Sequence, residues 1–123
     1  MANNMFDLTG RRALVTGSSQ GIGFALAQGL AGAGARVVLN GRDASKLAAA
    51  AARIAGAETL AFDATDHEGV RAAVDAMEAA GKPIDILVNN AGMQHRAPLE
   101  DFPAAAFEKL LQTNIASVFH VGQ

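Results

Sequence analysis

The chain has 123 residues, of which half are apolar and 18% are charged, and its formal net charge is −2. This length suits one domain with a hydrophobic core, and the composition excludes a disordered acidic tail and a basic nucleic-acid-binding protein. Cysteine is absent, which excludes disulfides, thiolate metal sites and a cysteine nucleophile.

Short apolar runs alternate with alanine-rich stretches along the chain, and this pattern predicts alternating strands and helices. The expected strands are 12–16, 36–40, 58–62 and 84–88, and the expected helices are 21–33, 43–55 and 66–81. Asp43 and Asp66 are expected to cap the second and third helices. A loop over 89–102 follows, and then an apolar helix that starts near Pro103 and runs to the end.

The expected strands are apolar on both faces, as parallel strands are when helices cover both sides of a sheet. Right-handed crossovers between them predict a Rossmann-type, doubly wound α/β fold with strand order 3-2-1-4. The whole of 1–123 is expected to form a single dinucleotide-binding domain. In its first helix we expect one apolar stripe, formed by Ile22, Ala25, Leu26 and Leu30.

The expected layout is short for a sheet of this kind. The last helix reaches Gln123 with no further strand to cover the fourth one. We therefore expect a domain truncated after the fourth strand and the long helix that follows it. Its open sheet edge and apolar last helix are expected to pair with a second copy, in a homo-oligomer, or with a complementary C-terminal part.

The segment between the first strand and the first helix carries the main chemical signal. It reads Thr-Gly-Ser-Ser-Gln-Gly-Ile-Gly from Thr16 to Gly23. Gly17 permits a tight turn, Gly21 lets the backbone approach a diphosphate, and Gly23 lets the helix pack against the strand. A plain tight turn is the alternative, but the flanking strand and helix favour nucleotide binding. The residues expected to contact a dinucleotide here are Gly17, Ser19, Gln20, Gly21, Ile22 and Gly23.

The spacing Thr-Gly-x-x-x-Gly-Ile-Gly resembles the coenzyme motif of the short-chain dehydrogenase/reductase family. Phe62–Ala64 after the third strand, Asn89–Gly92 after the fourth and Asn114 in the long helix also match motifs of that family, in the same order. The resemblance covers essentially the whole chain. It implies an NAD(P)-dependent oxidoreductase that acts on a small alcohol or carbonyl substrate.

The resemblance also implies roles for individual residues. It places Asp63 and Ala64 against the adenine and Asn114 in the catalytic proton relay. It further implies coenzyme contacts from Asn90, Ala91 and Gly92. The residue types alone leave alternatives open, because Asp63 also suits a turn cap, Asn90 a tie between strand ends, and Asn114 a solvent-facing position.

The end of the second strand indicates which coenzyme is bound. NAD enzymes place an acid there to accept hydrogen bonds from the ribose hydroxyls, whereas this chain has Asn40, with Arg42 two residues later. A neutral side chain removes repulsion, and a guanidinium offers a bidentate partner for a 2′-phosphate. The sequence therefore predicts NADP(H) over NAD(H). The alternative is a solvated Arg42 beside a merely capping Asp43.

The catalytic residues that the resemblance implies are not all present. In the family a tyrosine exchanges a proton with the substrate, a lysine four residues later lowers its pKa, and a serine orients the substrate. The chain has no tyrosine. These residues are expected after Gln123, and the chain alone is expected to be catalytically silent. A non-catalytic module that binds a nucleotide or a partner is the alternative.

Two segments, 39–42 and 93–103, resemble the gluconate 5-dehydrogenase branch of the family, which implies a sugar acid as substrate. His95 and Arg96 lie in the second segment and are candidates for substrate contact, although loop side chains of this kind are more often solvated. The histidines are too dispersed to predict a metal site. No signal peptide is expected in Met1–Gly10, no stretch is long enough to span a membrane, and the expected location is the cytoplasm.

Overall fold

The computed structural model describes residues 5–123, so the amino-terminal segment in which no signal peptide is expected lies partly outside the described residues. The strands and helices follow in the order β1 (Arg12–Val15), α1 (Gly21–Gly32), β2 (Arg36–Gly41), α2 (Ala44–Ala51), β3 (Glu58–Ala61), α3 (His67–Ala79), β4 (Ile86–Val88), α4 (Ala104–Leu111) and α5 (Ser117–Gly122). A 3₁₀ turn at Leu99–Asp101 lies in the loop before α4, and a π-helical segment at Gln112–Ala116 joins α4 to α5.

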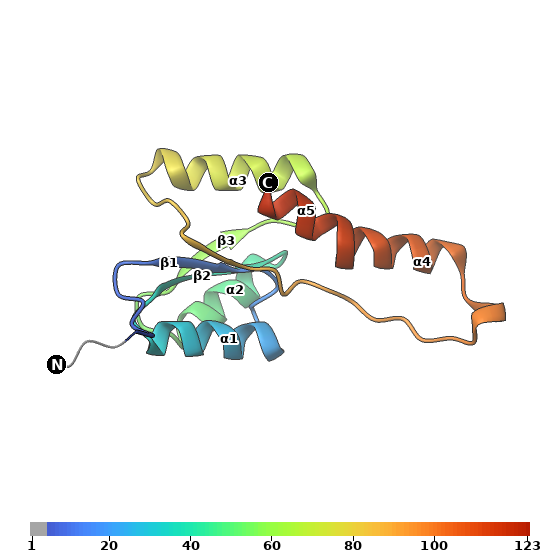
Figure 1. The fold of residues 1–123 in the computed structure, drawn as a ribbon, viewed down its shortest axis with the longest axis horizontal. Coiled ribbons are helices and arrows are strands. Elements are labelled where there is room, and N and C mark those ends of the chain that lie inside the picture. The colour runs from blue at the N-terminus through green and yellow to red at the C-terminus, as the bar shows by residue number, and fades with distance from the viewer. Residues whose placement is uncertain (1–4) are drawn as a thin grey trace.

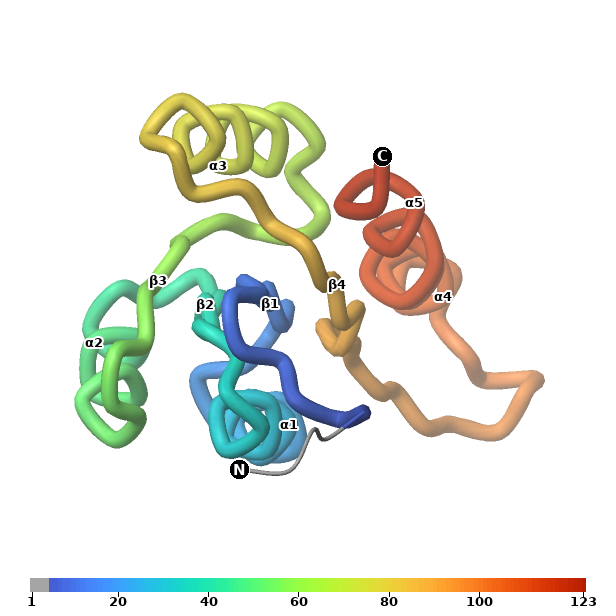
Figure 2. The backbone as a smooth tube through the Cα atoms, turned by 60° about the vertical axis from the view of Figure 1, so that its left-hand side comes forward, coloured from blue at the N-terminus to red at the C-terminus, as the bar shows by residue number. Residues whose placement is uncertain are grey.

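Four parallel strands form one sheet in the order β3-β2-β1-β4, which confirms the predicted topology. Figure 1 shows α1 and α2 below the sheet and α3 and α5 above it, so the fold is the doubly wound α/β arrangement of Rossmann type. β4 is an outer strand of this sheet, and the last helices lie beyond it in Figure 2. The same view places the end of the chain beside α3.

The apolar side chains of β1 and β2 alternate between the two faces of the sheet, because successive residues of a strand point to opposite sides. One face forms a core with α1 and α2, built on Ala13, Val15, Val37, Leu39, Phe24 and Leu47. The other face forms a core with α3, built on Leu14, Val38, Val70 and Met77. These two cores hold the carboxyl ends of β1 and β2 in a fixed position.

Two expectations about the packing are wrong. Residues of β3 alternate between half-buried and exposed and those of β4 are half-buried, so only β1 and β2 are well covered on both faces. In α1 only Leu30 of the expected stripe packs against the core, whereas Ala25 is exposed and Ile22 and Leu26 are 76% and 41% exposed. Nearly every residue of α1 is apolar, so its pattern does not select a face, and Gly23 and Ala27 lie buried where the helix approaches the sheet.

The expected helix caps are confirmed. The Asp43 carboxylate accepts hydrogen bonds from the backbone N–H groups of Ser45 and Lys46, at 2.9 and 3.2 Å. The Asp66 carboxylate accepts one from the N–H of Gly69 at 3.1 Å. Each bond satisfies a donor that the start of a helix otherwise leaves unpaired, so α2 and α3 begin at defined residues.

Glu58, the first residue of β3, joins three separate parts of the chain. Its carboxylate lies 2.9 Å from Arg12 Nε of β1 and 2.9 Å from Lys82 Nζ, in the turn after α3. Its side chain is only 16% exposed. Burial by itself raises the pKa of Glu58, but the hydrogen bonds and charges of Lys82 and Arg12 outweigh burial and hold the pKa below its ordinary value.

We expect a Glu58→Gln variant to lose about 1–2 kcal/mol of unfolding free energy at pH 7, because two cations lose a shared partner. A depressed folded pKa contributes stability above the unfolded pKa, about 4.3 for Glu, and the contribution disappears as pH falls through the folded pKa. The difference between the parent protein and the variant should therefore shrink in acid. Urea unfolding between pH 3 and pH 7 measures this difference. The control is Glu78→Gln, at an exposed position of α3. A difference that grew in acid would contradict the assignment.

The last helical stretch leaves large apolar side chains exposed, namely Phe107, Leu111, Ile115, Val118 and Phe119. Among residues 5–123 no helix combines the length and hydropathy that crossing a membrane requires. Within the same range, no three metal-ligating side chains come together in a way that could hold an ion.

Candidate functional site

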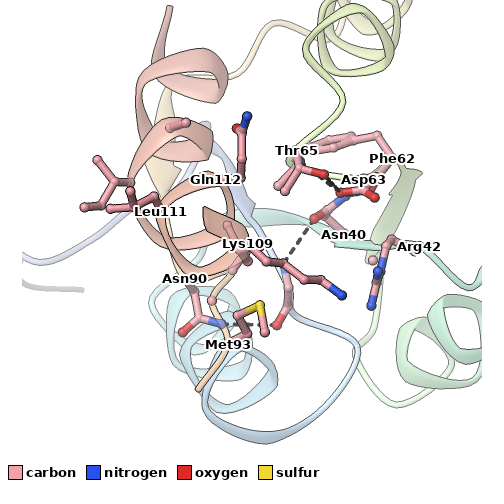
Figure 3. Close-up of a pocket in the computed structure, with 18 of the residues that line it drawn as sticks. Asn40, Arg42, Phe62, Asp63, Thr65, Asn90, Met93, Lys109, Leu111 and Gln112 are labelled. Carbon is pink, nitrogen blue, oxygen red and sulfur yellow. Dashed lines mark hydrogen bonds between the residues drawn. The ribbon is translucent and has the colours of Figure 1, made fainter. Parts of the chain in front are cut away.

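A cleft of about 1310 Å³ lies between the carboxyl ends of the strands and α4 (Figure 3). Ligands of open parallel sheets bind at this edge, and the volume exceeds that of most sites for a single small molecule. Of the residues predicted to contact a coenzyme, the cleft is lined by Gly17, Asn40, Arg42, Asp63, Ala64, Asn90, Ala91 and Gly92. Ser19, Gln20, Gly21, Ile22, Gly23 and Asn114 lie outside its lining.

The glycine-rich turn between β1 and α1 has the geometry of an anion cradle. Gly17 and Gly21 have φ angles of 61° and 64°, in the left-handed region that favours glycine. Gln20 precedes α1 without any side-chain hydrogen bond to it, and the first turn contains no acidic residue. The backbone N–H groups that open this 12-residue helix, and the positive end of its dipole, are therefore available to a phosphate.

Gly23 fixes how closely α1 approaches this turn. A Cβ atom at Gly23 would lie 2.4 Å from the Gly17 carbonyl oxygen, 2.5 Å from Asn90 Nδ2 and 2.9 Å from Ser18 Cα. No side chain fits at such distances, so only glycine permits the contact. The predicted packing role of Gly23 therefore has a steric basis in the structure.

Thr16 and Asn90 connect the turn to the end of β4. The Thr16 hydroxyl accepts hydrogen bonds from the N–H groups of Asn90 and Ala91, at 3.0 and 2.9 Å. Asn90 Nδ2 donates to the Gly17 carbonyl at 3.1 Å. The structure thus shows the alternative anticipated for Asn90, a tie between strand ends, and adds Thr16, for which the sequence predicted no such role.

Asn40 belongs to the cleft lining, but its side chain is bonded to the protein backbone. It is 2% exposed, and its Oδ1 accepts a hydrogen bond from the Gly17 N–H at 3.0 Å. Its Nδ2 donates to the carbonyls of Leu60 and Phe62, at 2.9 and 3.2 Å. Both hydrogens of the amide are used, so the side chain joins the glycine-rich turn to β3 and is not free to bind a ribose.

Gly41, at the end of β2, also lines the cleft, and it was not among the predicted site residues. Side chains alternate along a strand, so a buried Asn40 turns position 41 toward the opposite side. A Cβ atom there would lie 3.5 Å from Ser19 Oγ and 3.6 Å from Leu47 Cδ2, which are ordinary contacts. An acid could therefore occupy this position, and in this chain a glycine does.

Asp63 has the turn-capping role that the sequence left open. Its Oδ1 accepts hydrogen bonds from the backbone N–H and the hydroxyl of Thr65, at 2.9 and 2.7 Å. The side-chain bond from Thr65 lowers the pKa of Asp63 most, and the backbone bond and the positive charges of Arg42 and Lys109 lower it further against the effect of burial. The carboxylate is therefore held charged at the rim of the cleft.

Asn114 lies in the π-helical segment that interrupts the expected continuous helix. Its amide pairs with both backbone groups of one residue, since Met93 N–H donates to Oδ1 at 2.8 Å and Nδ2 donates to the Met93 carbonyl at 3.0 Å. The wider π turn is a common feature of functional helices. The side chain thus fixes the segment after β4 against the helix, and a part in a proton relay stays a prediction from the resemblance.

The loop histidine offers less to the site than the sequence suggested. His95 is exposed and packs edge-on against Phe102, with ring centroids 5.1 Å apart. Neither His95 nor Arg96 lines the cleft. The geometry therefore adds no support to a substrate contact by either residue.

Comparison with known proteins gives consistent matches. The sequence model of the short chain dehydrogenase family matches residues 11–123. Gluconate 5-dehydrogenase of Gluconobacter oxydans is 51% identical over 98% of this chain and 48% of its own length. 5-keto-D-gluconate 5-reductase of Escherichia coli K12 is 39% identical over 98% of this chain and 49% of its own. A gluconate 5-dehydrogenase from Burkholderia cenocepacia, solved in complex with NADP and tartrate, has a TM-score of 0.92 and 49% identity over 96% of this chain and 48% of that one. The chain spans about half the length of the curated relatives it matches.

Proposed function

Because the chain belongs to the short-chain dehydrogenase family, we propose that it forms the coenzyme-binding part of an NADP(H)-dependent oxidoreductase. The observation that carries the proposal is the uncapped start of α1 beside a turn whose two left-handed positions are glycines. A diphosphate suits this position because the open N–H groups and the helix dipole both favour an anion. Asp63, Ala64 and Asn90 to Gly92 then flank the remainder of the coenzyme in the cleft.

The preference for NADP(H) rests on Gly41 and Arg42. Gly41 leaves the cleft without the acid that would bind ribose hydroxyls and repel a 2′-phosphate. Arg42 lines the same cleft and has no ion-pair partner among residues 5–123. A guanidinium in this position can hold a phosphate through two parallel hydrogen bonds. The complex of the Burkholderia relative with NADP supports the same choice.

When bound, the nicotinamide would supply hydride transfer to or from a substrate carbon. The residues of this chain hold the coenzyme, and Asn114 positions the segment after β4 by its two bonds to Met93. No tyrosine occurs in the 123 residues, so the proton donor that the family resemblance implies is not among them. We propose a sugar acid as the substrate of the whole enzyme, because the gluconate 5-dehydrogenase and the 5-keto-gluconate reductase are similar along this chain.

We expect Arg42→Gln to weaken NADPH binding by about tenfold to a hundredfold, the worth of one charge-assisted pair, and to leave NADH binding nearly unchanged. Gly41→Asp should go further and reverse the preference, because the new carboxylate repels the 2′-phosphate, pairs with Arg42 and accepts bonds from ribose hydroxyls. Titration of coenzyme fluorescence with each variant measures both effects.

Arg71→Gln, on the exposed surface of α3 and outside the cleft, is the matched control and should not change either affinity. A parent protein that binds NADH more tightly than NADPH contradicts the proposed preference. Failure to bind either coenzyme, in a sample shown to be folded by circular dichroism, contradicts the proposed function as a whole.

We also propose that the exposed apolar face of α4 and α5 is covered in a homo-oligomer or by a complementary C-terminal part. The support is the row of exposed side chains from Phe107 to Phe119, which water solvates poorly. A Phe119→Glu variant should then change the assembled mass measured by light scattering.

A further inference from the structure

The cleft contains a second cation besides Arg42. Lys109, on α4, lines the cleft across from the β2 end that carries Arg42. Figure 3 shows both side chains extending into the same space, Arg42 from the sheet and Lys109 from the helix. The two positive charges therefore meet at one end of the cleft.

The neighbours of Lys109 along its helix face offer it no ion pair. On a helix, the residues three and four positions away are its neighbours, and these are Ala105, Ala106, Gln112 and Thr113. All of them are uncharged, and no ion pair to Lys109 occurs among residues 5–123. The lysine also does not cap a helix end, because the chain continues through Gln112–Ala116 into α5.

The two cations share one carboxylate. The charges of both Arg42 and Lys109 act on Asp63, whose Oδ1 already accepts two hydrogen bonds from Thr65. Glu108 also lines the cleft, so the cleft as a whole has no excess of positive charge. Any selection of an anion must therefore come from where the two cations are placed, at one end and on opposite walls.

The glycine-rich turn adds no cation of its own, since it carries Gln20 between Ser19 and Gly21. Its backbone N–H groups suit the diphosphate, and Ser19, whose Oγ would lie 3.5 Å from a Cβ atom at Gly41, brings no positive charge to the β2 end. We propose that Lys109 and Arg42 together clamp the 2′-phosphate of the adenosine, so that Lys109 is a specificity-determining residue for NADP(H). This inference rests on the proposed function and deepens it.

The test uses ligands that occupy only the adenosine end. Adenosine 2′,5′-bisphosphate carries the 2′-phosphate, and adenosine 5′-monophosphate lacks it. For Lys109→Gln we expect an affinity loss of about tenfold for the bisphosphate and for NADPH, the worth of one charged contact, and less than about twofold for the monophosphate and for NADH. Lys109→Arg, which keeps the charge, should recover most of the affinity. Isothermal titration calorimetry gives all of these constants without any turnover.

Lys46→Gln is the matched control, because it removes a lysine that lies on nearby α2 but outside the cleft lining. The affinities for all four ligands should not change in this variant. An unchanged bisphosphate affinity in Lys109→Gln overturns the inference, and so does an equal loss for ligands with and without the 2′-phosphate. Both results are distinct from a failure of the proposed function, in which the parent protein itself binds neither NADPH nor NADH.

Discussion

A Gly23→Ala variant is expected to lose about 3 kcal/mol of unfolding free energy and to lose coenzyme binding. The added methyl group would overlap the Gly17 carbonyl oxygen at 2.4 Å and the Asn90 amide at 2.5 Å. One of these contacts is with backbone and the other with a side chain already bonded to Gly17, so neither can move without opening the turn. Separation of α1 from the turn also displaces the N–H groups proposed to hold the diphosphate.

The same helix provides a matched control for this variant. Gly29 lies on α1, and a Cβ atom added there would meet no atom within 4 Å, so Gly29→Ala encounters no obstacle. It should gain about 0.5–1 kcal/mol, because alanine is the better helix residue. Urea unfolding and NADPH titration of both variants measure the contrast. Equal stability of the two variants would show that the close contact at Gly23 does not constrain the fold.

Replacement of Asn40 by leucine should be at least as damaging, at about 3–5 kcal/mol. The amide of Asn40 satisfies one N–H and two carbonyl groups of the backbone, at Gly17, Leu60 and Phe62. Leucine has a similar size but can bond to none of them, and the position is only 2% exposed, so water cannot take over.

Asn40→Asp separates a structural role from a coenzyme-selecting one. If Asn40 selected the coenzyme, the aspartate would bind NADH in a folded protein. We expect instead that it destabilises the fold, because a buried carboxylate would face the two carbonyl oxygens of Leu60 and Phe62. Gly41→Asp should stay folded and change the preference. Asn89→Asp, at an exposed position, is the control for the charge alone. A stable Asn40→Asp variant that prefers NADH would contradict this division of roles.

The arrangement of strands and helices could be predicted from the sequence because it depends on local patterns. Short apolar runs, the capping aspartates and the glycines at the turns define the elements. The right-handed crossover rule then leaves few ways to order four parallel strands, and the observed order β3-β2-β1-β4 is among them. The motif residues lie at one edge of the sheet for the same reason.

What the sequence could not provide is the direction in which individual side chains point. A shift of one residue at the end of β2 exchanges the buried and the cleft-facing position, and only the pairing of Asn40 with Leu60 and of Gly41 with Ala61 decides between them. The sequence likewise did not determine which face of α1 is buried, because the helix carries apolar residues on all of its sides. The position of Lys109 depends on how α4 crosses the cleft, which is set by tertiary packing and by the π-helical segment around Asn114.

In the proposed complex, the N–H groups at the start of α1 hold the diphosphate of a nicotinamide coenzyme. Titration of the ¹⁵N-labelled protein with NADPH, followed by two-dimensional NMR, observes these groups individually. We predict the largest amide shifts at residues 17–23, with ADP reproducing them because it contains the same diphosphate. The opposite result is that saturating NADPH leaves the amide signals of residues 17–23 unshifted, whether or not other signals move. That result would contradict this position for the diphosphate.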